Sequence, residues 1–327
     1  MQSWWMQMTD SATTLELRDS PMPVAGAGQL LVRLHAAALN RGEFLPGGLH
    51  GQPDSWKAIG SEGAGEVVAV GAEVETFRAG DRVMGRCPAA FSQYAVMEAA
   101  EAMAIPAGLS WEQAASVPLA FLVAFDMLVL QGRLKAGEWL LVNGVSSGVG
   151  VASLQLAKAL GAYVIGTSGS ADKLAALAPL GLDVALCTRR PDFAAGVMAA
   201  TARRGADLIV NTVGGSVFAE DVRALAFEGR LATVGYVDGV VHAEIDLAAL
   251  HAKRLTLFGV SNKLRSKAQR AAAVPRFVAE VIPLIAAGRI EPQIDRVVDF
   301  ARLADAKARM EEGAHVGKIV LRMPGAS

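Results

Sequence analysis

Short apolar segments alternate with helical segments through the middle of the chain. The apolar segments cover residues 139–143, 162–166, 184–186, 207–211, 230–234 and 254–258. Most of them are separated by stretches with apolar residues at helical spacing, at residues 149–160, 171–179, 194–203 and 217–227. Strands and helices that alternate in this way form a parallel sheet with helices on both faces. The sequence therefore predicts an α/β fold with a doubly wound sheet.

The segments on either side follow other patterns. Residues 29–105 alternate short apolar runs with glycines, which is typical of antiparallel β structure. Residues 111–132 are apolar at helical spacing, and Ser110 is a suitable N-cap, so we expect a helix there. Near the end, residues 267–288 and 300–312 predict two helices, and residues 318–321 predict a strand.

Length, net charge and cysteine content limit the number of domains, the kind of partner and the compartment that we expect. A chain of 327 residues has enough material for about two domains, at roughly 150 residues per domain. Its 31 Lys and Arg residues nearly balance its 32 Asp and Glu residues, so we expect no nucleic-acid partner. Cys87 and Cys187 are too few for a disulfide framework or a four-cysteine zinc site, which favours a reducing compartment.

Hydrophobicity predicts no membrane partner. The most apolar stretch, residues 117–130, is interrupted by Pro118 and Asp126 and falls short of the roughly 20 residues that a bilayer crossing needs. The first ten residues lack the pattern of a secretory signal peptide. We therefore expect a cytoplasmic protein.

A small-residue turn joins the first strand of the alternating region to its first helix. The residues that we expect at a dinucleotide pyrophosphate are Ser146, Ser147, Gly148, Val149 and Gly150. Backbone N–H groups at a helix N-terminus, together with the helix dipole, favour the negative charge there. Of the G-x-G-x-x-G pattern, only Gly150 is kept, because Val145 and Ser147 replace the first two glycines. Alternatively, Gly148 and Gly150 only allow tight packing of helix on strand.

The end of the second strand indicates which dinucleotide is bound. NAD-binding folds place a carboxylate there for the adenosine ribose hydroxyls, but residues 166–170 contain none. Hydroxyls and cations suit a ribose 2′-phosphate instead, and the chain offers Ser168, Ser170, Lys173 and Arg189. We therefore expect NADPH rather than NADH. The alternative is that Lys173 and Arg189 are solvated surface charges.

The chain resembles the zinc-independent quinone oxidoreductases of the medium-chain dehydrogenase/reductase superfamily. The similarity runs from about residue 29 to residue 321. The residues that carry it are Gly60-Ser61-Glu62-Gly63-Ala64-Gly65-Glu66-Val67-Val68, Val70-Gly71, Phe77, Gly80-Asp81-Arg82-Val83, Asn40 with Glu43, Val149-Gly150, residues 166–170 with Lys173, Val213-Gly214-Gly215, Gly229-Arg230 and Gly317-Lys318-Ile319-Val320-Leu321.

This resemblance implies a three-part organisation of the chain. Residues 1–121 would form a GroES-like, partly open β-barrel domain, residues 122–260 a Rossmann NADP-binding domain, and residues 261–327 a return that completes the first domain. The cleft between the domains would hold the nicotinamide and the substrate. The edge strand at residues 254–260 would pair across a two-fold axis in a homodimer.

The resemblance also implies a site without metal. Zinc-dependent relatives place a cysteine after the first barrel strand and a Gly-His-Glu element later, whereas this chain has Ala38 and Asn40 in the first region and Ser61 before Glu62 in the second. Catalytic zinc needs about three protein ligands of Cys, His or carboxylate type. We therefore expect no metal.

Further site residues follow by resemblance. Asn40 and Glu43 would lie near the nicotinamide, although Glu43 could equally be a buried structural carboxylate. His50 stands where many members carry a tyrosine, and is either a proton donor or a surface histidine. Additional cofactor contacts would come from Val213, Gly214, Gly235, Tyr236, Phe258, Gly259 and Val260. The expected walls of the substrate pocket are Phe44, Trp56 and Leu119.

These expectations favour one activity and leave two others open. Without a Lewis acid to stabilise an alkoxide, hydride delivery to an acceptor that delocalises charge is favoured. We expect an NADPH-dependent reductase of quinones or activated enones. The alternatives are a 2-enoyl thioester reductase and a low-turnover NADPH-binding sensor or structural protein.

Overall fold

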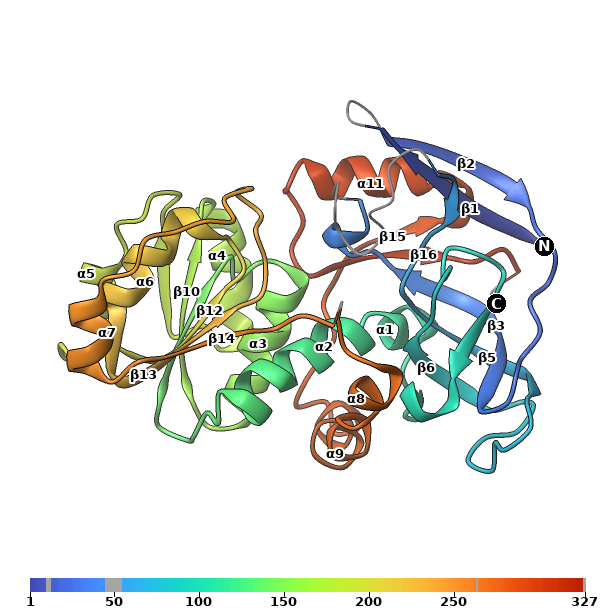
Figure 1. Ribbon diagram of the computed structural model, residues 1–327, viewed down its shortest axis with the longest axis horizontal. Coiled ribbons are helices and arrows are strands. Elements are labelled where there is room, and N and C mark those ends of the chain that lie inside the picture. The colour runs from blue at the N-terminus through green and yellow to red at the C-terminus, as the bar shows by residue number, and fades with distance from the viewer. Residues whose placement is uncertain (10–12, 45–54, 263, 326–327) are drawn as a thin grey trace. The chain divides into compact units, whose positions relative to one another are not determined.

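The computed structural model of the protein describes residues 1–9, 13–44, 55–262 and 264–325. The chain forms two compact units, drawn in Figure 1. Unit 1 consists of Met1–Leu119, Arg265–Ala287 and Pro292–Ser327, and unit 2 consists of Ala120–Leu264 and Gly288–Glu291. The chain therefore leaves unit 1, builds unit 2 and returns. In the described residues no helix is long and apolar enough to span a membrane.

Unit 2 is built on a six-stranded parallel sheet. Its strands are β9 (Trp139–Asn143), β10 (Tyr163–Ser168), β11 (Val184–Cys187), β12 (Ala206–Asn211), β13 (Leu225–Thr233) and β14 (Thr256–Gly259). They lie in the order β11-β10-β9-β12-β13-β14. Numbered from β9, this is the order 3-2-1-4-5-6 of a doubly wound sheet, as the sequence predicts.

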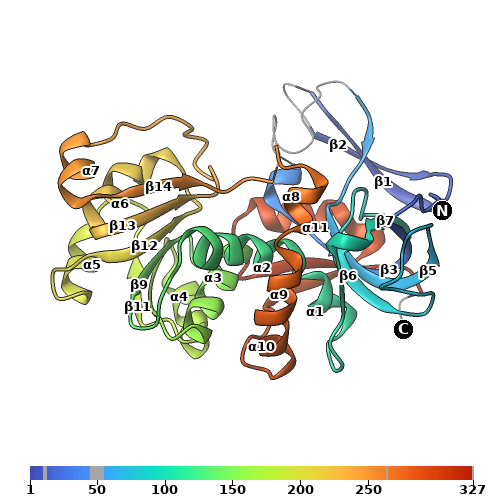
Figure 2. The same cartoon turned by 60° about the horizontal axis from the view of Figure 1, so that its bottom comes forward.

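Helices cover both faces of this sheet. They are α3 (Gly148–Ala159), α4 (Ala171–Leu177), α5 (Ala194–Ala200), α6 (Phe218–Ala224) and α7 (Leu247–Lys253). On one face α5 packs against α6 and α6 against α7, whereas α3 and α4 lie on the other face (Figure 2). The strand order reverses between β9 and β12, so their carboxyl ends mark the crevice where such folds bind ligands.

The helix predicted at residues 217–227 is shorter in the structure. Helix α6 ends at Ala224, and Leu225 already has the extended conformation that begins β13. Lys253 at the end of α7 donates from Nζ to the carbonyls of Val222, Arg223 and Leu225, at 2.9–3.2 Å. A cation at a helix C-terminus satisfies carbonyls that have no partner within the helix, which explains why the helix can stop there.

Unit 1 contains two mainly antiparallel sheets. The smaller has the order β2-β1-β4 and the larger the order β15-β16-β3-β5-β6-β8, with β7 paired to β3. The strands are β1 (Gln2–Met8), β2 (Thr13–Asp19), β3 (Gln29–Ala38), β4 (Lys57–Ala58), β5 (Glu62–Val70), β6 (Arg82–Arg86), β7 (Tyr94–Glu98), β8 (Ala102–Ala104), β15 (Ile294–Asp299) and β16 (Lys318–Arg322). Strands from both ends of the sequence thus share one sheet.

Gly60 shows why the motif before β5 needs a glycine. Its φ is +101°, a conformation that side chains disfavour, and a Cβ atom there would lie 2.4 Å from the Phe91 backbone nitrogen. Gly60 therefore lets the chain approach the segment after β6 and turn into β5. The next two residues, Ser61 and Glu62, then enter the interior.

Proline residues divide two of the predicted helices. Residues 111–132 form α1 (Trp111–Ala115), α2 (Pro118–Phe125) and a π-helical segment (Asp126–Gln131), and Ser110 caps α1 as expected. Residues 267–288 form α8 (Lys267–Ala271), α9 (Val274–Glu280) and α10 (Ile282–Ala286), and α11 spans Leu303–Glu311. Pro118, Pro275 and Pro283 each lie in the first turn of a new helix, where the missing N–H costs nothing.

Candidate functional site

The turn after β9 has the geometry of a phosphate-binding turn. Ser147 caps α3, because its Oγ accepts a hydrogen bond from the Gly150 backbone N–H at 3.0 Å. A Cβ atom on Gly150 would lie 2.5 Å from the Gly144 carbonyl oxygen, so only glycine fits. The helix N-terminus is thereby held close to the end of the strand, with Ser146 and Gly148 in the same turn. Backbone N–H groups at such a position attract an anion.

A buried polar network lies beneath this turn. The Asn143 side chain donates from Nδ2 to Asp221 Oδ1 at 2.5 Å and accepts from Thr167 Oγ1 at 2.9 Å. Thr212 Oγ1 donates to the Asn143 carbonyl at 2.7 Å. The network therefore joins β9 and β10 to α6 and to the residue after β12. The network was not predicted from the sequence, in which Asn143 at the end of an apolar strand indicates a buried polar group but not its partners.

Asp221 is the acidic member of the network. It is fully buried, and burial raises the pKa of its carboxyl group well above the ordinary value, with a further rise from the neighbouring Glu220. Its Oδ2 atom has no hydrogen-bond partner among the described residues. A neutral carboxylic acid is the form that such surroundings favour.

The end of β10 brings together three of the four residues expected at a ribose 2′-phosphate. Ser170 caps α4 by accepting a hydrogen bond from the Lys173 N–H at 3.4 Å, and Ser168 accepts a backbone bond from Thr188 at 3.0 Å. Arg189 Nε lies 3.5 Å from the Gly169 carbonyl oxygen, so Arg189 lies against the loop that holds both serines. Lys173 follows in the first turn of α4. No carboxylate occurs at residues 166–170.

The loops after β12 and β13 contain the next group of expected cofactor contacts. Asn211 Oδ1 accepts from the backbone N–H groups of Val213 and Gly214, both at 2.9 Å. The Asp238 N–H donates to the Val213 carbonyl at 2.9 Å, so the loop that carries Gly235 and Tyr236 contacts the first loop. These side-chain and backbone bonds fix the conformation of both loops.

The last expected cofactor contacts lie at the end of β14. Phe258 and Gly259 are paired with Ala232 and Thr233 of β13. The Val260 N–H donates to the Thr233 carbonyl at 3.0 Å. All three residues therefore lie at the carboxyl edge of the sheet.

In unit 1, Asn40 and Glu43 belong to a second buried network. Asn40 precedes a 3₁₀ turn (Arg41–Glu43), and its N–H donates to Glu43 Oε2 at 3.1 Å. Ser61 Oγ donates to the other Glu43 oxygen. The Asn40 side chain donates from Nδ2 to Glu62 Oε1 at 2.8 Å and accepts from Lys318 Nζ at 2.7 Å. Glu62 and Lys318 therefore fix the orientation of the Asn40 side chain.

Two carboxylates and one ammonium group form the charged centre of this network. Lys318 Nζ also donates to Glu62 Oε1 at 2.7 Å, and the Leu119 N–H donates to Glu62 Oε2 at 2.7 Å. Glu62 thus has a countercharge, whereas burial raises the pKa of Glu43 to about 7, opposed by its bonds with Ser61 and Asn40 and by the Lys318 charge. The Glu43 carboxyl group therefore changes between its protonated and ionised forms near neutral pH. Ser61 and Lys318 were not assigned roles from the sequence.

The residues expected in a substrate pocket lie in different surroundings. Phe44 is buried, with its ring centroid 6.4 Å from that of Phe91. Trp56 lies under the Arg18 guanidinium, 3.9 Å from the ring centroid. Leu119 is half-buried and bonds to Glu62 through its backbone. His50 lies outside the described residues.

The donor set around Asn40 does not fit a catalytic zinc ion. The side chains there are an amide, a hydroxyl and two carboxylates, and the Glu62 carboxylate already binds the Lys318 ammonium group. Zinc requires several Cys, His or carboxylate ligands around one point. Across residues 1–9, 13–44, 55–262 and 264–325, no three side chains of Cys, His, Asp or Glu come together as a metal site.

Comparisons with known proteins agree with this architecture. Residues 26–125 match the family model of the alcohol dehydrogenase GroES-like domain, and residues 148–278 match the model called zinc-binding dehydrogenase. The human synaptic vesicle membrane protein VAT-1 homolog is 30% identical over 327 residues, which cover 95% of this chain and 83% of that protein. The highly reducing polyketide synthase lcsB of Purpureocillium lilacinum is 32% identical over 91% of this chain, but the chain spans only 12% of its length.

Two solved structures match this chain over nearly its whole length. A mycobacterial protein in complex with NADPH has a TM-score of 0.88 and 27% identity, covering 98% of this chain and 100% of that one. A quinone oxidoreductase of Pseudomonas syringae pv. Tomato DC3000 has a TM-score of 0.86 and 28% identity, covering 98% of this chain and 99% of that one. The chain therefore belongs to the medium-chain dehydrogenase/reductase superfamily, as its resemblance to quinone oxidoreductases of that superfamily predicted.

Proposed function

We propose that the protein uses NADPH to reduce quinones or activated enones by hydride transfer, without zinc. The observation that carries this proposal is the end of β10, where Arg189 lies against the loop that holds Ser168 and Ser170 and residues 166–170 contain no carboxylate. A guanidinium group and hydroxyls bind a phosphate dianion, whereas a carboxylate would repel it. The NADPH complex of the mycobacterial relative supports the same choice.

NADPH would be held along the carboxyl edge of the sheet in unit 2. The turn at residues 146–150 would bind the pyrophosphate, and Ser168, Ser170, Lys173 and Arg189 the 2′-phosphate. The loops at Val213–Gly214 and Gly235–Tyr236, with residues 258–260, would contact the nicotinamide half. When bound, the cofactor supplies the hydride, and the protein contributes binding and orientation.

In unit 1, the residues proposed to bind the acceptor or to transfer a proton to it are Asn40, Glu43 and His50. Asn40 would present its amide to the acceptor carbonyl or a ribose hydroxyl, in an orientation that Glu62 and Lys318 fix. Glu43, which can hold or release a proton near pH 7, and His50 are the candidate proton donors. The half-buried Leu119 and Trp56, with Phe44, would supply the apolar walls.

The absence of fitting ligands around Asn40 supports zinc-independent chemistry. The Lys318 ammonium group already neutralises Glu62, and the Glu43 carboxyl group is bonded to the Asn40 N–H and to Ser61, so both acids already have partners. An acceptor that delocalises charge does not need a Lewis acid. Quinones and enones meet that condition, whereas a simple ketone or aldehyde becomes an alkoxide whose charge stays on one oxygen.

A panel of acceptors tests the proposed function. Purified protein is given NADPH or NADH with quinones and α,β-unsaturated carbonyls, and nucleotide oxidation is followed at 340 nm. We expect turnover with NADPH and at least one acceptor, unchanged by a zinc chelator. Absence of turnover with every acceptor overturns the proposal, and tight NADPH binding without turnover would instead indicate a sensor or structural protein.

A second candidate function is reduction of a 2-enoyl thioester. The match to part of a polyketide synthase favours it, because that relative's name places it in the synthesis of polyketides. Crotonyl-CoA in the same panel distinguishes the two candidates. Faster NADPH oxidation with crotonyl-CoA than with any quinone or free enone would favour the thioester.

We also propose that the protein forms a homodimer through β14. This strand lies at one edge of the sheet in unit 2 and pairs only with β13 among the described strands. An edge strand carries backbone N–H and C=O groups that a second copy can bind across a two-fold axis.

A further inference from the structure

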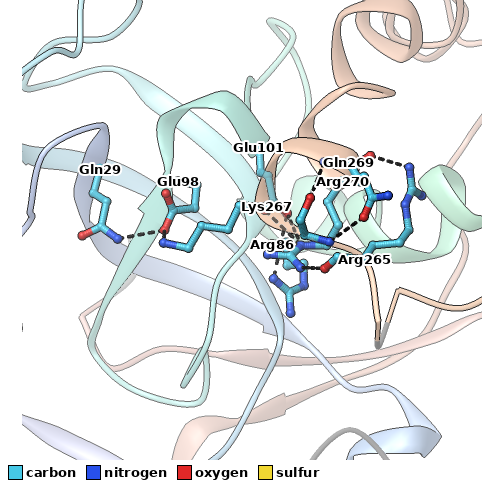
Figure 3. Close-up of polar contacts among 9 residues, drawn as sticks. Gln29, Arg86, Glu98, Glu101, Arg265, Lys267, Gln269 and Arg270 are labelled. Atoms are coloured by element: carbon cyan, nitrogen blue, oxygen red, sulfur yellow. Dashed lines mark hydrogen bonds and ion pairs between the residues drawn. The ribbon is translucent and has the colours of Figure 1, made fainter.

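Three cationic side chains pair with two carboxylates near the start of α8 in unit 1, and a fourth, an arginine, lies beside them (Figure 3). We call this group the basic cluster. Its cations are Arg86 of β6 and three residues of the returning segment, Arg265, Lys267 and Arg270, and its carboxylates are Glu98 and Glu101. Positive charge therefore exceeds negative charge within the cluster.

Both carboxylates are already engaged by cations. Glu98 Oε1 accepts from Lys267 Nζ at 2.6 Å and from Gln29 Nε2 at 2.8 Å. Glu101, only 6% exposed, accepts from Arg270 Nε with both oxygens, at 3.1 and 3.4 Å. Arg270 also donates from Nη1 to the Arg265 carbonyl at 2.6 Å. The carboxylates therefore hold Lys267 and Arg270 against the end of β7 and the 3₁₀ turn (Ala99–Glu101) that follows it.

Arg86 differs from the other members of the basic cluster. Its one ion pair with the described residues is to Glu101 Oε2 at 3.9 Å, which is too long for a hydrogen bond. Burial lowers the pKa of its guanidinium group, and the neighbouring Arg270 charge lowers it further. Five N–H donors are thus partly removed from water without a close acceptor. The side chain is 28% exposed, so a ligand can still reach it.

Arg86 lies next to the network that contains Asn40. In the antiparallel pair of β5 and β6, Arg86 stands directly opposite Glu62. Residues paired in this way point to the same face of a sheet. Arg86 therefore shares a face with the carboxylate that holds Asn40 and Lys318.

We propose that Arg86, with Arg270 behind it, forms a binding subsite for a carboxylate or phosphate group carried by the substrate. A planar guanidinium binds either oxyanion through two parallel hydrogen bonds. The ligand would supply the acceptors that Arg86 lacks and the negative charge that the cluster lacks. The anion site stands on the cluster alone, and only its assignment to the substrate rests on the proposed reductase function.

The first test measures anion binding without any cofactor. Thermal unfolding of the full chain is followed in chloride buffer, then with inorganic phosphate or acetate at equal ionic strength. We expect at least one of these anions to raise the Tm of the wild type. We expect Arg86→Met to have a Tm no lower than the wild type in chloride and to lose the anion-dependent rise.

Two variants control this measurement. Phosphate could also bind at Arg189, so Arg189→Ala should keep the rise that Arg86→Met loses. Arg302→Met removes an exposed arginine that pairs with Asp305 in the same unit, and should behave as the wild type with anions. If Arg86→Met has a lower Tm than the wild type in chloride, Arg86 acts mainly as a structural partner of Glu101. That result, or an anion effect that persists in the variant, overturns the proposal.

The second test compares an enone that carries a remote carboxylate with its methyl ester, and with a phosphate-bearing analogue. We expect Arg86→Met to lower kcat/KM about tenfold for the preferred anionic substrate, the loss expected for one charged hydrogen bond. Turnover of the ester should be unchanged. Equal losses for acid, phosphate and ester overturn the subsite. If the wild type reduces none of them, the proposed function fails, and the Tm measurement still decides the anion site.

Discussion

Glu43 is a fully buried carboxyl group in unit 1, bonded to Ser61 and to the Asn40 N–H. Its folded-state pKa of about 7 lies above the ordinary value of 4.5, so the folded protein holds this proton more tightly than the unfolded chain does. Stability from this group is complete below about pH 4.5 and is lost as the pH rises through 7. The difference corresponds to about 3 kcal/mol.

Replacing Glu43 by glutamine should remove this pH dependence. Urea unfolding at pH 5, 6, 7 and 8 should show the Glu43→Gln variant gaining stability relative to the wild type as the pH rises. Glu66→Gln, at a partly exposed position on β5, is the control and should follow the wild type. Parallel curves for the wild type and Glu43→Gln would contradict the raised pKa.

Lys173 and Arg189 should determine the choice between the two nucleotides. We expect Lys173→Ala and Arg189→Ala each to weaken NADPH binding about tenfold, because each removes a charged partner of the 2′-phosphate. NADH binding should hardly change. Titration of nucleotide fluorescence measures both constants, and Arg190→Ala, the adjacent exposed arginine, is the control. Equal weakening of NADPH and NADH would show that the two cations do not bind the 2′-phosphate.

The Asn143–Asp221 contact joins the end of β9 to α6 beneath the turn at residues 144–150. Asp221→Asn keeps a neutral acceptor for Asn143, as the protonated acid does. Asp221→Leu leaves a buried Asn143 donor without a partner, which costs about 1–3 kcal/mol. We therefore expect urea unfolding to show near wild-type stability for Asp221→Asn and a clear loss for Asp221→Leu. Equal losses in both variants would show that shape, not hydrogen bonding, matters there.

Elements with a strong periodic signal could be predicted from the sequence. The strand at residues 139–143 coincides with β9, and the helix at 149–160 differs from α3 by one residue at each end. Helix boundaries at Pro118, Pro275 and Pro283 were missed because apolar spacing continues across each proline. The buried network of Asn143 and Asp221 could not be predicted, since 78 residues separate two side chains that only the folded sheet brings together.

The same limit applies to the candidate site. Ser168, Ser170 and Arg189 could be predicted to lie near one another because they stand at the ends of neighbouring strands, which meet at one edge of a parallel sheet. From the sequence, Lys318 was recognised only as part of the last predicted strand, without a role in the site. Its ion pair with Glu62 depends on β16 joining the sheet of β3 and β5, a tertiary pairing that no local pattern encodes.

The proposed dimer requires β14 to pair with the same strand of a second copy of the whole molecule. Leu257 in this edge strand is 36% exposed, and a lysine there should oppose pairing with a second copy. Sedimentation equilibrium should give a dimer for the wild type and a monomer for Leu257→Lys. Leu247→Lys, on α7 and 66% exposed, should remain dimeric. A monomeric wild type, or a dimeric Leu257→Lys, would rule out this interface.

The distance along the chain between Glu62 and its countercharge affects how the protein can be made. Lys318 follows Glu62 by 256 residues, so a ribosome must synthesise all of unit 2 before this acid can be neutralised and enclosed. The first strands of unit 1 are therefore made long before the lysine that pairs with Glu62. A translation product that stops before this lysine would retain an uncompensated charge in its interior and become a substrate for proteolytic quality control.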